Sequence, residues 1–215
     1  MKCNAYFPAL RRIGLRIDAE LRRWGWYPAG SGEIPCKLGA DRAASRFNPI
    51  NVDERGPLRQ VAGTAVAANL PAHIPQPMAD RARASLGDLG VSINIVPRRV
   101  TAARPGAGIF LSLSTRAWRQ ASGYGRLGKP SKGVADEPVV ALREHHVSGG
   151  AVELPLADQL LLLLSFAAGI STFTTRRPTN HLLTNAWVLG QFAVADISIE
   201  QGTSCRVRIE PRRRL

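Results

Sequence analysis

The sequence predicts an α/β chain of the α+β type, in which helices pack against mixed sheets. Short segments of alternating apolar and polar residues, typical of strands, recur along the whole chain. Apolar stripes with helical spacing fall between them, and the links are of hairpin length. The 215 residues, 45% of them hydrophobic, are enough to bury a sizeable core.

The N-terminal part begins with a helix-like segment from Tyr6, followed by apolar alternation at Leu15, Ile17 and Ala19 that is typical of a strand. The stretch GWYPAGSG (25–32) is expected to turn, because its glycines permit a positive φ. The segment INVDERGP (50–57) is expected to be a connection.

The middle part alternates strands with helices. The expected elements are a strand at 58–70, a helix at 71–90, a strand at 91–102, a turn at 105–108 and a strand at 109–114. A glycine-rich basic loop (122–133) leads to a helix at 135–147, with Pro138 in its first turn.

The C-terminal part pairs two helices with three strands. The helix expected at 156–169 is apolar on nearly every side, which is typical of a buried helix. Thr179 or Asn180 is suited to cap a final helix at 182–192. Strands are expected at 171–177, 194–200 and 204–210.

The charge is strongly positive. The chain has 29 Lys and Arg against 16 Asp and Glu, a formal net charge of +13, and 25 of the basic residues are arginines. Because the arginine fork matches phosphate oxygens, RNA or DNA is the first partner to consider. A compositional bias of the genome is the alternative, and charge alone leaves it open.

The cysteines and hydropathy predict a cytoplasmic protein with no membrane segment. Cys3, Cys36 and Cys205 are odd in number and far apart, which argues against disulfides and a zinc site. No secretory signal is visible at the N-terminus, and the longest apolar run (160–168) is too short to cross a bilayer.

His181 is the first candidate for chemistry. With Thr179 or Asn180 as the cap, it falls in the first turn of its helix, where the partial positive charge favours a neutral imidazole and attracts anions. A neutral imidazole beside a bound phosphate is suited to attack on phosphorus. Asp158 and Gln159, at the start of the apolar helix, are suited to grip a nucleotide or a metal. The ordinary alternatives, a surface histidine and an aspartate that complements the helix dipole, stay open.

Six segments together show a resemblance to a known family. They are RRWGWYPAGSGEI, ERGPLRQVAGTAVAANLPAHIP, PGAGIFLSL, GRLGKPSKGVADE, LADQLLLLL and HLLTNAWVLGQF. In this order they resemble RNA 3'-terminal phosphate cyclases, from about Tyr6 to Glu210.

The resemblance implies an ATP-dependent ligase-type enzyme of RNA processing or repair. A histidine becomes linked to AMP, AMP passes to an RNA 3'-phosphate end, and the 2'-OH closes a 2',3'-cyclic phosphate. The family's adenylylated histidine matches His181. Its nucleotide-binding run matches Pro155, Leu156, Ala157, Asp158 and Gln159, and a divalent metal, Mg or Mn, normally assists.

The resemblance also implies a division of the chain. Residues 1–54 and 151–215 are expected to form an incomplete catalytic core built from repeated sheet-plus-helix units, and 55–150 a smaller inserted α/β domain. Relatives carry a further N-terminal portion with part of the ATP pocket. We therefore expect exposed apolar surface, and a chain that is poorly soluble or needs a partner.

Three positions depart from the family pattern. Trp24 stands where a basic residue is usual, Ser31 replaces a glycine of the loop, and Pro155 replaces a side chain that stacks on adenine.

Two other functions stay open. One is a catalytically inactive cyclase-like protein that binds RNA or assists ribosome assembly, and the other is a non-functional fragment.

Overall fold

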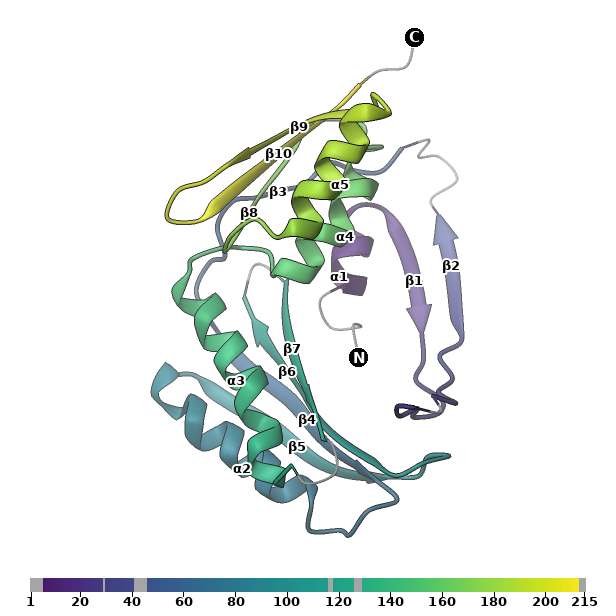
Figure 1. Ribbon diagram of the computed structural model, residues 1–215, viewed down its shortest axis with the longest axis vertical. Helices are drawn as coiled ribbons and strands as arrows, with labels where there is room; N and C mark the ends of the chain where they lie inside the picture. Colours follow the sequence, from purple (N-terminus) through teal and green to yellow (C-terminus); the bar gives the residue numbers. More distant parts are fainter. Residues whose placement is uncertain (1–5, 29, 41–45, 116–117, 126–128, 213–215) are drawn as a thin grey trace.

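The computed structural model describes residues 6–28, 30–40, 46–115, 118–125 and 129–212. It contains helices and mixed sheets, so the predicted α/β class is confirmed. Figure 1 shows two bodies, each a sheet with helices on one face, and a separate hairpin beside them. Two hydrophobic cores correspond to the two larger sheets.

The first sheet has the strand order β3-β8-β10-β9. Its strands are β3 (Asn51–Val52), β8 (Ser171–Thr175), β9 (Ala195–Glu200) and β10 (Cys205–Pro211). β3 runs parallel to β8, and the other neighbours are antiparallel. The helices α1 (Tyr6–Arg12), α4 (Leu154–Leu164) and α5 (Asn180–Gln191) share its core. Phe173 at the centre of β8 is fully buried there.

The hairpin consists of β1 (Leu15–Ala19) and β2 (Cys36–Ala40), paired antiparallel. β1 was expected from its alternation, whereas β2 was missed, although Cys36, Leu38 and Ala40 alternate with Lys37 and Gly39. The hairpin projects beside α1 and carries the glycine-containing loop at its far end (Figure 1).

The second sheet has the order β5-β4-β6-β7. Its strands are β4 (Gln60–Ala68), β5 (Ser92–Val100), β6 (Gly106–Ser114) and β7 (Trp118–Tyr124), and its helices are α2 (Pro75–Leu86) and α3 (Ser131–Val147). A short 3-10 turn, η2 (Gly87–Leu89), follows α2. Both helices cover the same face (Figure 1), and the side chains of that face form the second core.

Thr174 on β8 holds two distant chain segments together. Its hydroxyl donates a hydrogen bond to the backbone oxygen of Asp53 at 2.6 Å. The hydroxyl oxygen of Thr174 also accepts a hydrogen bond from the backbone N–H of Ala151 at 3.0 Å. The chain therefore leaves for the second sheet and returns from it at one side chain. The division at 54/55 and 150/151 stays a prediction.

Three expectations about the elements were wrong. The connection expected at 50–57 contains the short strand β3. Pro138 does not lie in the first turn of its helix, because α3 already begins at Ser131. Because proline has no N–H, Pro138 cannot bind the carbonyl of Val134 as a helical residue would. Gly123 of β7 lies against that carbonyl, and a Cβ at Gly123 would be 2.3 Å from the carbonyl oxygen. The turn expected at 105–108 is instead the start of β6, which begins at Gly106.

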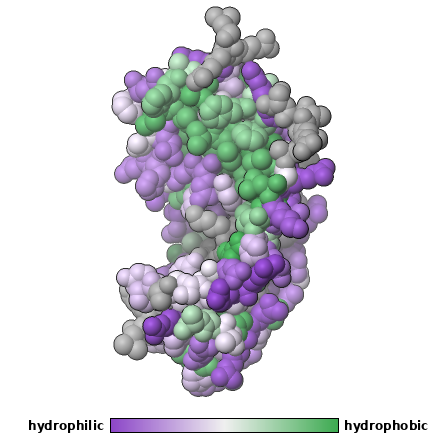
Figure 2. All heavy atoms as spheres, turned by 90° about the vertical axis from the view of Figure 1, so that its right-hand side faces the viewer, coloured by the Kyte–Doolittle hydropathy of each residue, from purple (hydrophilic) through white to green (hydrophobic). Residues whose placement is uncertain are grey.

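The helix α4 is buried on one side only. Leu160, Leu161 and Leu164 lie in the core, but Leu162 is about half exposed, so burial on every side was wrong. Figure 2 shows apolar side chains gathered over the part of the molecule that carries α4 and α5. The large exposed apolar residues of this region are Leu162, Phe166, Leu183, Trp187 and Phe192. No helix in the described ranges is long and apolar enough to cross a membrane.

Candidate functional site: a cavity between two helices

A cavity of about 520 Å³ lies between α4 and α5. It is lined by Pro155, Asp158, Gln159, Leu162, His181, Asn185, Val188 and Leu189. Its volume is in the range of sites for small ligands, and a few polar groups converge on an otherwise apolar wall. The structure therefore brings His181 together with three of the five residues expected to bind nucleotide.

The first turn of α5 is fixed by its cap. Thr179 is the N-cap, and its side-chain oxygen accepts the backbone N–H of Leu182 at 2.9 Å. His181 is consequently the second residue of the helix, and its side chain is exposed toward the cavity. The first amides of a helix have no partner within the helix, so this end favours an anion.

Asp158 joins the two helices. The hydroxyl of Thr179 donates a hydrogen bond to Oδ1 of Asp158 at 2.7 Å. Because the same hydroxyl oxygen accepts from Leu182, one threonine connects the α4 carboxylate to the start of α5. The orientation of the turn that carries His181 thus depends on Asp158. Sequence reasoning placed both residues near the site but did not find this contact.

The remaining expected residues divide between wall and core. Pro155, in the first turn of α4, is exposed at the cavity, and Gln159 lines it one turn later. Leu156 and Ala157 are each 1% exposed and lie in the core beneath. Their side chains therefore pack α4 against the core, and their part in nucleotide binding stays a prediction.

The two arginines before the helix have different surroundings. Arg176 forms an ion pair with Glu144 of α3, so its charge is largely balanced by that carboxylate. Arg177 is exposed. Of these two arginines, Arg177 is therefore the better placed to attract an anion near the start of α5.

The chain matches a family model and named relatives over most of its length. The family model described as "RNA 3'-terminal phosphate cyclase" matches residues 2–199. The chain belongs to the RNA 3'-terminal phosphate cyclase family. It is 42% identical over 199 residues to the RNA 3'-terminal phosphate cyclase of Methylococcus capsulatus, covering 91% of this chain and 54% of that protein.

Two further relatives are also RNA 3'-terminal phosphate cyclases by name. The cyclase of Nostoc punctiforme is 38% identical, over 92% of this chain and 56% of its own length. The cyclase of Thermococcus onnurineus is 34% identical, over 94% of this chain and 59% of its own length. The chain spans about half the length of the curated cyclases it matches.

In the glycine loop of this cyclase-family chain, Gly25 and Gly32 do not have the expected positive φ, whereas Gly30 does. Gly30 has φ +66° and Ser31 has φ +60°. Ser31 is therefore a residue with a side chain at a left-handed position, as expected from its replacement of a family glycine. A Cβ at Gly25 would lie 2.4 Å from the backbone nitrogen of Gly32, so the two strands of the loop touch backbone to backbone.

Within the described ranges, no three His, Cys, Asp or Glu side chains converge to form a metal site. Asp158 is the acidic residue among those that line the cavity. A metal at this cavity would therefore take most of its ligands from water, from substrate or from other protein segments.

Proposed function

We propose that the cavity between α4 and α5 is the nucleotidyl-transfer site of an ATP-dependent RNA 3'-phosphate cyclase, with His181 as the nucleophile. The observation that carries this is the placement of His181 in the capped first turn of α5, facing a cavity that Asp158 and Gln159 share. A helix start is a favourable place for a phosphate, and a neutral imidazole nitrogen can attack phosphorus there.

The proposed reaction has three balanced steps. An imidazole nitrogen of His181 attacks the α-phosphorus of ATP, the bond to the β-phosphate oxygen breaks, and pyrophosphate leaves. An oxygen of the RNA 3'-phosphate then attacks the same phosphorus, which breaks the P–N bond and frees His181. Finally the 2'-OH attacks the RNA phosphorus, loses its proton to solvent or a base, and expels AMP.

Each part of the cavity has a role in this proposal. Thr179 and Asp158 hold the turn so that His181 meets the α-phosphate, while Gln159 contributes polar contacts to the nucleotide. Pro155 presents an apolar surface where the adenine would lie. Asp158 would be a ligand of a divalent metal, Mg or Mn, which would offset the charge of the phosphates. We also propose a cytoplasmic location, in keeping with the free thiols of Cys36 and Cys205.

The test is the intact mass of the protein after incubation with ATP and Mg²⁺ or Mn²⁺. We expect an acid-labile AMP adduct on the wild type and on His73→Ala, whose histidine is exposed elsewhere, and none on His181→Ala. An adduct that persists in His181→Ala would refute the assignment. A folded wild type that binds RNA but never gains AMP would favour an inactive RNA-binding relative.

The RNA part of the proposal has its own signature. With a net charge of +13, the affinity for single-stranded RNA should fall by orders of magnitude between about 50 and 200 mM salt. The measurement is a binding titration at several salt concentrations. Salt-independent binding would show that the arginines do not contact phosphates.

A further inference from the structure

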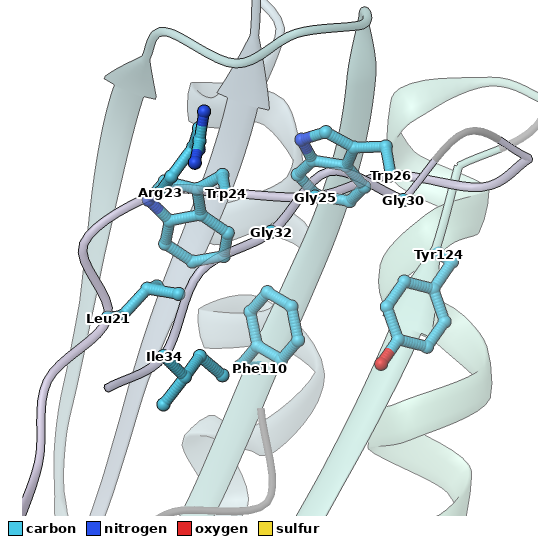
Figure 3. Close-up of a pocket in the computed structure, with 10 residues that line it drawn as sticks. All are labelled: Leu21, Arg23, Trp24, Gly25, Trp26, Gly30, Gly32, Ile34, Phe110 and Tyr124. Carbon is cyan, nitrogen blue, oxygen red and sulfur yellow. The ribbon is translucent and has the colours of Figure 1, made fainter. Parts of the chain in front are cut away.

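Four aromatic side chains gather where the glycine loop meets the second sheet. Trp24 and Trp26 of the loop are stacked, with ring centroids 6.0 Å apart and planes 10° from parallel. Trp24 also lies 5.8 Å from Phe110 of β6. Phe110 in turn meets Tyr124 of β7 edge-on at 5.9 Å. Figure 3 shows these rings around a common space.

Trp26 fastens the loop to the sheet. A Cβ at Gly106 would lie 2.3 Å from the Trp26 ring, and one at Gly108 would lie 3.3 Å from it. The two glycines therefore leave room for the indole to lie directly on β6. Trp26 is 7% exposed and packs with Val66 and Ala68. Its role is structural, and it brings Trp24 over Phe110.

The space bounded by the rings is a cavity of about 460 Å³, separate from the one that contains His181. Leu21 and Ile34 close one side of it, and Tyr124 stands on the other (Figure 3). Tyr124 is 54% exposed and Ile34 is 45% exposed, so apolar surface is open to solvent here. The helices α2 and α3 lie on the opposite face of the sheet.

One arginine lines this cavity, and a second lies on the same face of the sheet. Arg23 lines it, although its guanidinium also contacts Glu33 at 2.7 Å. Arg98 of β5 is paired in register with Val66, whose side chain packs against Trp26, so Arg98 lies on the same sheet face. Arg98 is exposed, and within the described part of the chain it has no acidic partner.

We propose that this cavity holds one unpaired nucleobase of single-stranded RNA. Aromatic side chains on the open face of a helix-backed sheet are a recurrent means of stacking bases, and nearby arginines then meet the backbone phosphates. The base stacks on the solvent-exposed Tyr124 ring, beside the Trp24–Phe110 pair, and Arg23 and Arg98 take the flanking phosphates. The inference rests on the proposed function insofar as RNA is the substrate, and it adds a place where the strand is held away from its reacting end.

The experiment measures the Kd of a short unstructured oligoribonucleotide that ends in a 3'-OH, so that end chemistry plays no part. We expect Tyr124→Ala to weaken binding roughly five- to a hundred-fold, the usual effect of losing one stacked base. Tyr124→Phe should bind within about twofold of the wild type, because the ring is kept. Phe192→Ala, which removes an even more exposed ring (73%) from the end of α5, is the control and should change nothing.

Two further arms separate the sources of the ligand. An abasic strand of the same length keeps the phosphates, and we expect Tyr124→Ala to bind it as the wild type does. AMP alone should bind both proteins equally. If Tyr124→Ala lowers AMP affinity by the same factor as RNA affinity, the cavity is a site for free nucleotide, and the assignment to RNA is overturned. Equal RNA affinity of Tyr124→Ala and wild type also overturns it.

The outcome is distinguishable from a failure of the catalytic proposal. Tyr124→Ala should gain the AMP adduct as the wild type does, whereas His181→Ala should lose the adduct and keep its affinity for the oligonucleotide. Far-UV circular dichroism and the melting curve establish that each variant is folded. Because Tyr124 is half exposed, its truncation leaves the core untouched.

Discussion

Replacing Thr179 by valine removes one hydroxyl that makes two hydrogen bonds and keeps the volume of the side chain. The first bond caps α5 through the N–H of Leu182, and loss of a threonine cap costs about 1 kcal/mol. The second is donated to Asp158, and a bond to a charged group contributes about 1.5–3 kcal/mol. Because Asp158 is only partly buried, water replaces part of the second bond. We expect a total loss of about 2 kcal/mol.

The free energy of unfolding is measured by urea denaturation, and the melting temperature by calorimetry. For a chain of this size, 2 kcal/mol corresponds to a drop of about 4–8 °C. Thr184→Ala, an exposed threonine within the same helix, is the matched control and should stay within about 0.5 kcal/mol. Thr179→Ser should retain most of the stability.

The same variants test whether the cap positions the histidine. If it does, Thr179→Val slows formation of the AMP adduct under conditions where the protein is folded, and Thr184→Ala does not. A Thr179→Val protein as stable as the wild type would refute the energetic reasoning. Normal stability loss with an unchanged adduct rate would refute the link to His181.

Three other outcomes follow from contacts described above or from titrating groups. Gly106→Ala should destabilise the protein by about 1–3 kcal/mol in urea, since its Cβ overlaps the Trp26 ring, whereas Gly190→Ala, whose Cβ meets nothing within 4 Å, should be neutral or slightly stabilising. Burial raises the pKa of the Cys205 thiol, so peptide mass spectrometry after iodoacetamide should find it unmodified in the folded protein and alkylated in urea. A side-chain hydrogen bond from Arg212 lowers the pKa of Asp196. The pair therefore stabilises the fold at pH values above the ordinary carboxyl pKa, and this stabilisation is lost as the pH falls through the lowered pKa. Arg212→Gln should raise the pKa of Asp196 measured by NMR.

Most elements could be predicted because their signals are local. Strand alternation gave β1, β4, β5 and the two final strands, and the threonine before an apolar stripe marked the start of α5. The residues of the site were also accessible from the sequence, since a cap and a histidine two positions later determine where that side chain stands.

What escaped the sequence depends on neighbours. The composition of α4 does not reveal which side another segment covers, so the exposure of Leu162 was missed. The aromatic cavity joins Trp24 to Phe110 across a long stretch of chain. One signal was available, because Gly106 and Gly108 alternate in a strand pattern, and glycine at such positions often marks close approach of a large group.

The contacts of Thr174 have a consequence for how the gene can vary. Everything between Asp53 and Ala151 begins and ends at one threonine side chain. The length of the segment between them therefore does not affect the register of β3 on β8. Residues can be added or removed within its surface loops without moving the sheet that supports His181. A substitution at Thr174, in contrast, removes the hydrogen bonds that its side chain makes to Asp53 and to Ala151, and so loosens both ends of the segment together.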